Sequence, residues 1–182
     1  ALSDAIRATS ARAIDQLRDM KIEPVIVSGD HAAAVASVAS TLGITQQFAS
    51  CTPQNKLERI ADAQQAGHVV AMVGDGVNDA AALAKAHLSL AMASGTDVAA
   101  SAADIVLMRS TMAAAVDAIA LSRATMKMIR LNLFWAFAYN VAAIPLAMSG
   151  RLGPIVASAA MAFSSVFVVT NSLRLRNFQS LD

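Results

Sequence analysis

Polar residues crowd the segment from Met72 to Leu83, MVGDGVNDAAAL, where an apolar stretch gives way to an alanine-rich one. Two carboxylates, Asp75 and Asp79, and the amide of Asn78 fall within five positions. Oxygen ligands of this kind suit a hard cation such as Mg²⁺, and the neighbouring glycines let backbone approach a ligand closely. The spacing also fits an ordinary turn in which Asn78 or Asp79 merely caps the next helix.

Further polar residues follow a second apolar segment or begin a helix. Ser28, Gly29 and Asp30 come directly after the apolar run 25–27, and Lys56 lies just after Thr52-Pro53, a helix-start signal. In a parallel sheet the carboxyl ends of the strands meet at one edge, and the start of a following helix can face that edge. We therefore expect these residues to converge with the Met72–Leu83 segment.

Such a convergence suits a phosphoryl group. The hydroxyl of Ser28 and the backbone at Gly29 would bind its oxygens, and Lys56 would neutralise its charge. Asp75 would hold Mg²⁺, while Asn78 and Asp79 orient the groups around the ion. Each signal is weak alone, because turn serines and solvated lysines are common.

Strands and helices alternate along the first part of the chain. This alternation predicts right-handed βαβ units around a mostly parallel sheet. Asp30 is placed to cap one helix and Gly43 to close it, and residues 44–50 fit neither pattern. The expected helices are Ser3–Met20, His31–Leu42 and Thr52–Gly67, and the expected strands are Pro24–Val27, Val69–Val73, Leu88–Met92 and Asp104–Leu107.

The last third of the chain is apolar. The whole sequence is 56% hydrophobic with a mean hydropathy of +0.52, and Leu131–Leu173 carries a single charge, Arg151. We expect a connector helix over 113–131, then membrane spans at 132–148 and 152–173. Basic residues flank the pair on both outer sides, which predicts that both ends are cytoplasmic and the intervening turn is outside. The same runs could be buried helices of a soluble protein, but the basic flanks argue against it.

Charge and cysteine content exclude some classes of function. A net charge of +1 argues against a nucleic-acid partner, which requires a larger basic surplus. The single cysteine, Cys51, excludes a disulfide framework and suits a reducing cytoplasm.

Four polar or sulfur-bearing side chains fall in the middle of the two expected spans: Tyr139 and Asn140 in the first, Met161 and Ser165 in the second. Polar groups at that depth are costly and often functional, although Asn and Ser also serve simply to pack helices. The thioether of Met161 suits soft, monovalent copper, whereas phenol and amide oxygens are poorer ligands that can orient or hydrogen-bond.

Several segments together resemble the second half of the phosphorylation domain of P-type ATPases, which has the haloacid-dehalogenase fold. They are VSGD at 27–30, TPQNK at 52–56, MVGDGVNDAAALAKA at 72–86, GTDVA at 95–99 and ADI at 103–105. The resemblance implies that Ser28, Gly29 and Lys56 contact an aspartyl phosphate. It further implies that Asp75 binds its Mg²⁺ and that Asn78 and Asp79 support the site.

This sequence departs from the family pattern at four positions. Ser28 stands where threonine is usual, which keeps the hydroxyl, and Ala81 replaces a usual proline. His87 and Ser89 replace a usual aspartate and glycine. None of these changes removes a charge or donor assigned to the phosphate.

The membrane residues point to one branch of the family. The Tyr139-Asn140 pair, with Met161-x-x-Ser164-Ser165, is similar to the signature of copper(I)-exporting heavy-metal pumps. Zinc and cadmium pumps of that branch are expected to carry a lysine and an aspartate in these helices, and neither is present. The family's Asp-Lys-Thr-Gly-Thr segment, which holds the nucleophilic aspartate, does not occur in the chain.

We therefore predict an α/β fold with a partial haloacid-dehalogenase-like (Rossmann-like) phosphorylation domain at 1–112, followed by a two-helix transmembrane hairpin and a cytoplasmic tail at 174–182. The chain is expected to be the carboxyl-terminal fragment of a copper(I)-exporting P-type ATPase in a bacterial inner membrane, inactive without the rest of the pump, which binds most of the ATP. The expected partners are that missing amino-terminal part, copper ion and the lipid bilayer. Two alternatives stay open: a pump of the same branch for silver, copper(II) or zinc, and a catalytically silent, membrane-anchored protein that binds phosphate or a partner.

Overall fold

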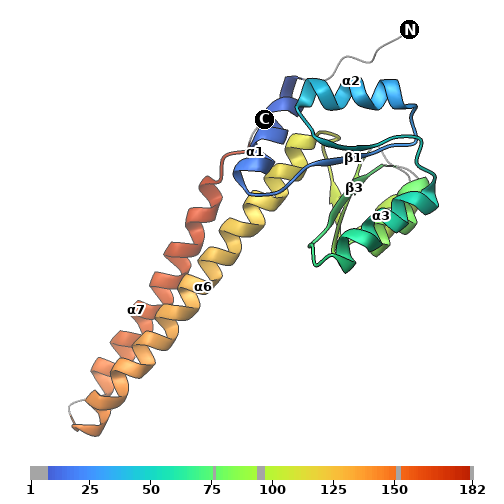
Figure 1. Ribbon diagram of the computed structural model, residues 1–182. Helices are drawn as coiled ribbons and strands as arrows, with labels where there is room; N and C mark the ends of the chain where they lie inside the picture. The colour runs from blue at the N-terminus through green and yellow to red at the C-terminus, as the bar shows by residue number, and fades with distance from the viewer. Residues whose placement is uncertain (1–7, 76, 94–96, 151–152, 181–182) are drawn as a thin grey trace. The chain divides into compact units, whose positions relative to one another are not determined.

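The computed structural model describes residues 8–75, 77–93, 97–150 and 153–180. By packing, the chain forms two compact units, one that reaches Asp117 and one over 118–180. The expected positions Ser3, Gly95, Thr96 and Arg151 lie outside the described residues. Figure 1 traces the two units along the chain.

The strands of the first unit are all parallel, as expected, but they form two sheets. One pairs β1 (Val25–Val27) with β2 (Gln46–Phe48), and the other has the order β3-β4-β5, with β3 at Ala71–Gly74, β4 at Leu88–Met92 and β5 at Ile105–Leu107. No ladder joins β1 to β3 within the described part of the chain. The expected single sheet is thus divided. The segment 44–50, which the sequence left unassigned, supplies β2.

The helices of the first unit connect these strands in chain order (Figure 1). The expected helices are present, and the ends that the structure describes differ from the expected ones by one or two residues. The short helix that follows β3 was expected from the alanine-rich segment after Asp79, whereas the short helix that follows β4 was not expected from the sequence. The helices are α1 (Ala8–Asp19), α2 (Ala32–Leu42), α3 (Pro53–Gln65), α4 (Ala80–Lys85) and α5 (Asp97–Ala102), with a 3₁₀ turn η1 at Val77–Asp79.

The helix caps were only partly foreseen. Thr52 caps α3 as expected, since its hydroxyl accepts from Asn55 N and the Asn55 side chain accepts from Thr52 N. Gly43 closes α2 in the left-handed conformation at φ 63°. The expected cap at Asp30 is wrong: His31 occupies that position without a side-chain bond, because the Asp30 carboxylate is taken by Ser28.

The core of the first unit lies around α4 and β4. Leu83, Leu90, Ala91 and Val116 are fully buried. Burying one leucine side chain contributes about 1.5–3 kcal/mol, which is essential for a six-residue helix such as α4, too short to be stable by itself. Packing against β4 therefore fixes where the segment after Asp75 can run.

The second unit contains two long helices, α6 (Met112–Met148), which begins in the first unit, and α7 (Pro154–Leu173), followed by a 3₁₀ turn η2 at Arg174–Asn177. The connector and the first span are one continuous helix, about 55 Å long at 1.5 Å per residue. Among the described residues, α6 is the one helix long and apolar enough to cross a membrane. The second expected span, at α7, stays a prediction.

Candidate functional site

The ammonium of Lys56 is held by the carboxylate of Asp79. Its Nζ donates to Asp79 Oδ1 across 2.6 Å, and the two side chains are only 15% and 11% exposed. Thr52 and Pro53 begin α3 and so place Lys56 in its first turn, while η1 carries Asp79 to the start of α4. Asp79 occupies the N-cap position of α4, but its side chain makes no capping bond. The alternative that Asp79 merely caps the helix is therefore wrong.

The position of Lys56 favours an anion nearby. A cation in the first turn of a helix meets the positive end of the helix dipole, so the helix itself opposes the charge of Lys56. Asp79 offsets that repulsion at close range. The same helix start, together with a lysine that has two remaining N–H donors, attracts a phosphate-like group.

The end of β3 brings backbone unusually close to Asp79. Gly74 is buried, and a Cβ placed there would come within 3.0 Å of Asp79 Cβ and 3.1 Å of its Oδ2. Only glycine fits without displacing the carboxylate. The next residue, Asp75, is exposed and makes no hydrogen bond or ion pair with the described residues, and Asn78 is exposed as well.

Ser28, Gly29 and Asp30 form a compact turn after β1. Ser28 Oγ donates to Asp30 Oδ2 across 3.0 Å and accepts from Asp30 N across 3.2 Å. Backbone bonds tie this turn to the segment after β2: Cys51 N donates to Ser28 O, and Ser50 N donates to Asp30 O. The Ser28 hydroxyl must exchange its bond to Asp30 before it can donate to a phosphate.

The predicted residues thus assemble as two pairs rather than one network. Lys56 meets Asp79, and Ser28 meets Asp30. Within the described residues, no hydrogen bond links one pair to the other.

The residues at the end of β3 fit a magnesium ion whose remaining ligands are waters and phosphate oxygens. No group of three or more His, Cys, Asp or Glu side chains in the described ranges could hold a metal alone. Mg²⁺ commonly uses one or two carboxylates, several waters and substrate phosphate oxygens. Asp75 offers an uncommitted carboxylate, whereas one oxygen of Asp79 already accepts from Lys56.

The mid-span residues Asn140 and Ser165 bond within their own helix. Asn140 Nδ2 donates to Ala136 O across 2.8 Å, and Ser165 Oγ donates to Met161 O across 3.2 Å. Tyr139 packs on Trp135, with ring centroids 6.0 Å apart. Met161 is 73% exposed, so its thioether is accessible on the surface of this unit.

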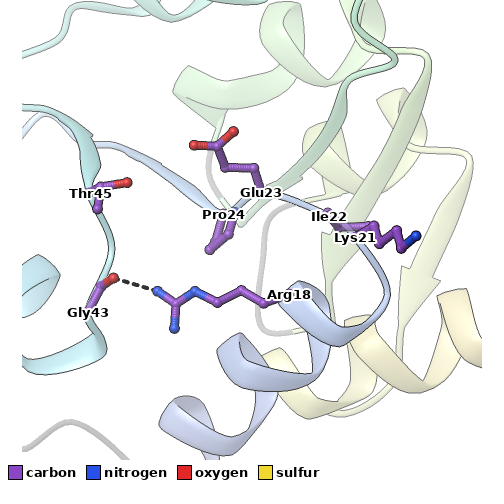
Figure 2. Close-up of a pocket in the computed structure, with 7 residues that line it drawn as sticks. All are labelled: Arg18, Lys21, Ile22, Glu23, Pro24, Gly43 and Thr45. Atoms are coloured by element: carbon purple, nitrogen blue, oxygen red, sulfur yellow. Dashed lines mark hydrogen bonds between the residues drawn. The ribbon is translucent and has the colours of Figure 1, made fainter.

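Neither of two surface cavities includes the predicted site residues. Figure 2 shows the first, about 340 Å³, where the guanidinium of Arg18 donates to the carbonyl oxygen of Gly43. A cation at the end of α2 stabilises that helix, so Arg18 has a structural role there. The second cavity, about 510 Å³, lies beside β2 and α3 and includes Cys51 and Asn55.

One well-defined polar pair was missed by the sequence reasoning. Ser89 Oγ donates to Asp104 Oδ2 across 2.7 Å, Ser89 N donates to the same oxygen across 2.8 Å, and Asp104 N donates to Ser89 Oγ. The Ser89 hydroxyl, and then its backbone N–H, lower the pKa of Asp104. The register Leu90↔Ile105 places these two residues opposite each other, which strand alignment could have indicated.

The parallel strands and their connecting helices define the class of this domain as haloacid dehalogenase-like. Parallel strands end in Ser28-Gly29 and Asp75, with Lys56 at the start of a helix between them. The family model described as haloacid dehalogenase-like hydrolase matches residues 1–87.

Comparison with curated proteins narrows this class. The chain is 49% identical over 181 residues to a copper-exporting P-type ATPase of Mycobacterium leprae, covering 100% of this chain and 23% of that protein. It is 49% identical over 177 residues to cation-transporting P-type ATPase B of Mycobacterium tuberculosis, covering 97% and 24%. The chain belongs to the heavy-metal P-type ATPases and spans about a quarter of the length of these relatives.

Solved structures agree on the architecture. A zinc-transporting PIB-type ATPase in its E2.Pi state matches 95% of this chain and 28% of its own, with a TM-score of 0.85 and 36% identity. The catalytic domain of a CPx-ATPase, CopB-B, matches 63% of this chain and 46% of its own, with a TM-score of 0.59 and 34% identity.

Proposed function

We propose that the chain is part of an ATP-driven copper(I) export pump, to which it contributes the Mg²⁺- and phosphate-binding half of an aspartyl-phosphate site and two helices of the ion path. The observation that carries the proposal is the largely shielded Lys56–Asp79 pair, together with the uncommitted carboxylate of Asp75 four residues before Asp79. A fixed ammonium and a free carboxylate at one strand-to-helix turn are the groups that a phosphoryl site with a divalent cation requires.

Each residue of this site has a distinct role in the proposal. Lys56, held in place by Asp79, neutralises charge on the phosphoryl oxygens with its remaining donors. Ser28 and the backbone at Gly29 donate to the same oxygens once the serine hydroxyl leaves Asp30. Lys56 is thus preorganised to stabilise charge, whereas Ser28 has to turn away from Asp30 before transfer.

Asp75 is the proposed Mg²⁺ ligand, with Asn78 and Asp79 orienting the groups around it. When bound, the ion would neutralise negative charge on the phosphoryl group. The aspartate nucleophile and most of the ATP site belong to the part of the pump outside this sequence.

Copper(I) is the proposed cargo. Met161 offers a soft thioether, which favours monovalent copper, and Asn140, Tyr139 and Ser165 provide weaker oxygen donors along the same helices. Relatives that are named as copper exporters, at 48–49% identity, support this choice. The setting proposed is the bacterial inner membrane, with both ends of this chain cytoplasmic.

An ion panel tests the cargo. The full-length pump in membrane vesicles should hydrolyse ATP faster with copper(I), and less or not at all with zinc. Silver is the matched control, because a soft monovalent ion should also stimulate. Stimulation by zinc but not by copper or silver would replace the proposed cargo, and no stimulation by any ion would favour a silent binding protein.

Replacement of Met161 tests the ion path. Met161→Leu keeps the approximate size of the side chain and removes the sulfur. Copper-stimulated hydrolysis should fall about tenfold or more, because losing a ligand should cost at least as much as losing a residue that only supports one. Met148→Leu is the matched control, since Met148 is 83% exposed at the end of α6. An unchanged copper response in Met161→Leu would remove Met161 from the path.

A further inference from the structure

Side-chain amides from α6 and α7 bond to each other within the second unit. Asn171 Nδ2 donates to Asn132 Oδ1 across 2.6 Å, and Asn132 Nδ2 donates to Ser172 Oγ across 3.1 Å. Asn171 is only 6% exposed, although most large apolar side chains of these two helices are exposed. We call Asn132, Asn171 and Ser172 the amide clasp.

An aromatic contact continues the same seam between the helices. The rings of Trp135 and Phe167 lie edge to face with centroids 6.0 Å apart. Trp135 follows Asn132 by three residues, and Phe167 precedes Asn171 by four. The two contacts therefore share one antiparallel register, and Figure 1 shows α6 and α7 running side by side.

This register sets the level of the proposed ion-path residues. Asn140 lies eight residues beyond Asn132, while Met161 and Ser165 lie ten and six residues before Asn171. Measured along the helix axes from the clasp, Asn140 therefore lies between the levels of Met161 and Ser165. A slip of one helical turn, about 5.4 Å, would separate them.

The directions in which Asn140 and Met161 leave their helix axes agree with this axial alignment. At about 100° per residue, Asn140 is turned about 80° from Asn132, and Met161 about 80° from Asn171, in the same sense. Because the helices are antiparallel, turns of the same sense bring both side chains to the same side of the seam. The clasp thus relates Asn140 to Met161 in both height and direction.

We propose that the amide clasp is a positioning device that fixes the axial register of α7 on α6, and so the level of Asn140 relative to Met161. Apolar side chains give little preference between registers in lipid, where there is no hydrophobic drive between helices. A slipped register would leave the Asn171 amide without its partner in an apolar seam, which is unfavourable. The register proposal stands on the contacts above, and its effect on copper rests on the proposed function.

Cysteine cross-linking in the full-length pump measures the register directly. Ala136→Cys with Val168→Cys reports the native register, and Ala136→Cys with Ser164→Cys reports a slip of one turn. A short bifunctional thiol reagent avoids copper-based oxidants. We expect Asn171→Leu to lower the ratio of native to slipped cross-link about three- to fifteenfold, the range for one polar contact between membrane helices.

Matched variants distinguish positioning from general damage. Thr170→Leu, an adjacent exposed position, should leave the cross-link ratio unchanged, and Asn171→Gln should restore part of it. If Asn171→Leu fails to reach the membrane, Asn132→Ala removes the bond to Asn171 from the other helix, together with the bond to Ser172. An unchanged ratio in the clasp variant that reaches the membrane would overturn the proposal.

Measuring the KM for copper distinguishes the register proposal from the proposed ion path. The clasp variants should raise the KM for copper while phosphorylation by inorganic phosphate, which reports the cytoplasmic site, stays unchanged. If the register shifts but the KM for copper does not, the clasp fixes register without serving the ion path. If Met161→Leu is also without effect, the proposed ion path itself fails.

Discussion

Lys56 Nζ donates to Asp79 Oδ1 across 2.6 Å and so joins the first turn of α3 to the start of α4. The two residues are 23 positions apart, and both side chains are largely shielded from water. Removing one partner of such a pair leaves an uncompensated charge, which commonly costs about 3–5 kcal/mol. The pair therefore links the stability of the domain to its proposed chemistry.

We expect Lys56→Met and Asp79→Asn each to lower the free energy of unfolding of the first unit by about 3–5 kcal/mol in the full-length pump. The double variant should lose less than the two single losses together, because no lone charge stays buried. Urea unfolding, monitored by hydrogen exchange, measures these losses of free energy. Asp15→Asn, which removes an exposed carboxylate paired with Arg18, should change stability by about 0–1 kcal/mol. Strict additivity of Lys56→Met and Asp79→Asn would show that the pair is not coupled.

Replacement of Ser28 tests its proposed contact with phosphate. Ser28→Ala should reduce the phosphoenzyme formed from inorganic phosphate about tenfold or more, the effect of one hydrogen bond to a charged group. Ser28→Thr keeps the hydroxyl and should retain most of the signal. Ser37→Ala, on the exposed side of α2, serves as a control. Equal phosphoenzyme in Ser28→Ala and the parent protein would exclude the contact.

A methyl group at Gly74 should displace Asp79. The added Cβ would lie 3.0 Å from Asp79 Cβ, so we expect Gly74→Ala to cost about 1–3 kcal/mol and to weaken phosphorylation. Gly153→Ala meets no atom within 4 Å and is the control for added bulk. Thermal unfolding and phosphorylation by inorganic phosphate report the two effects. If Gly74→Ala behaves like Gly153→Ala, the close approach is unimportant.

Acid should weaken the contact between β4 and the segment before β5. Ser89 lowers the pKa of Asp104, so the stabilisation by the ionised carboxylate is present above the unfolded pKa and is lost as pH falls through the folded pKa. Ser89→Ala removes the hydroxyl but keeps the backbone donor, and should raise the pKa of Asp104. Carboxyl NMR titration measures this shift. Acid sensitivity should therefore begin at higher pH in Ser89→Ala, and an unmoved Asp104 titration would contradict this account.

Local sequence was enough to predict most elements of the fold. The strands at β1, β3, β4 and β5 were found because apolar runs end at turn residues, and Thr52-Pro53 and Gly43 marked helix ends through their own backbone preferences. The candidate site was named for the same reason, since Asp75 and Lys56 lie at recognisable strand and helix boundaries. These signals act within a few residues, so they are readable without a three-dimensional partner.

Tertiary structure decided which of those side chains meet. Asp30 turned to Ser28 rather than to the helix start, Asp79 joined Lys56, and the amides of Asn132 and Asn171 met across 39 residues. The division of the strands into two sheets was likewise settled by packing. Such partners depend on the register between elements, which is fixed by burial and by distant hydrogen bonds rather than by the residues beside them. The sequence by itself therefore determined which residues make up the candidate site, and only the tertiary structure decided how their charges are paired.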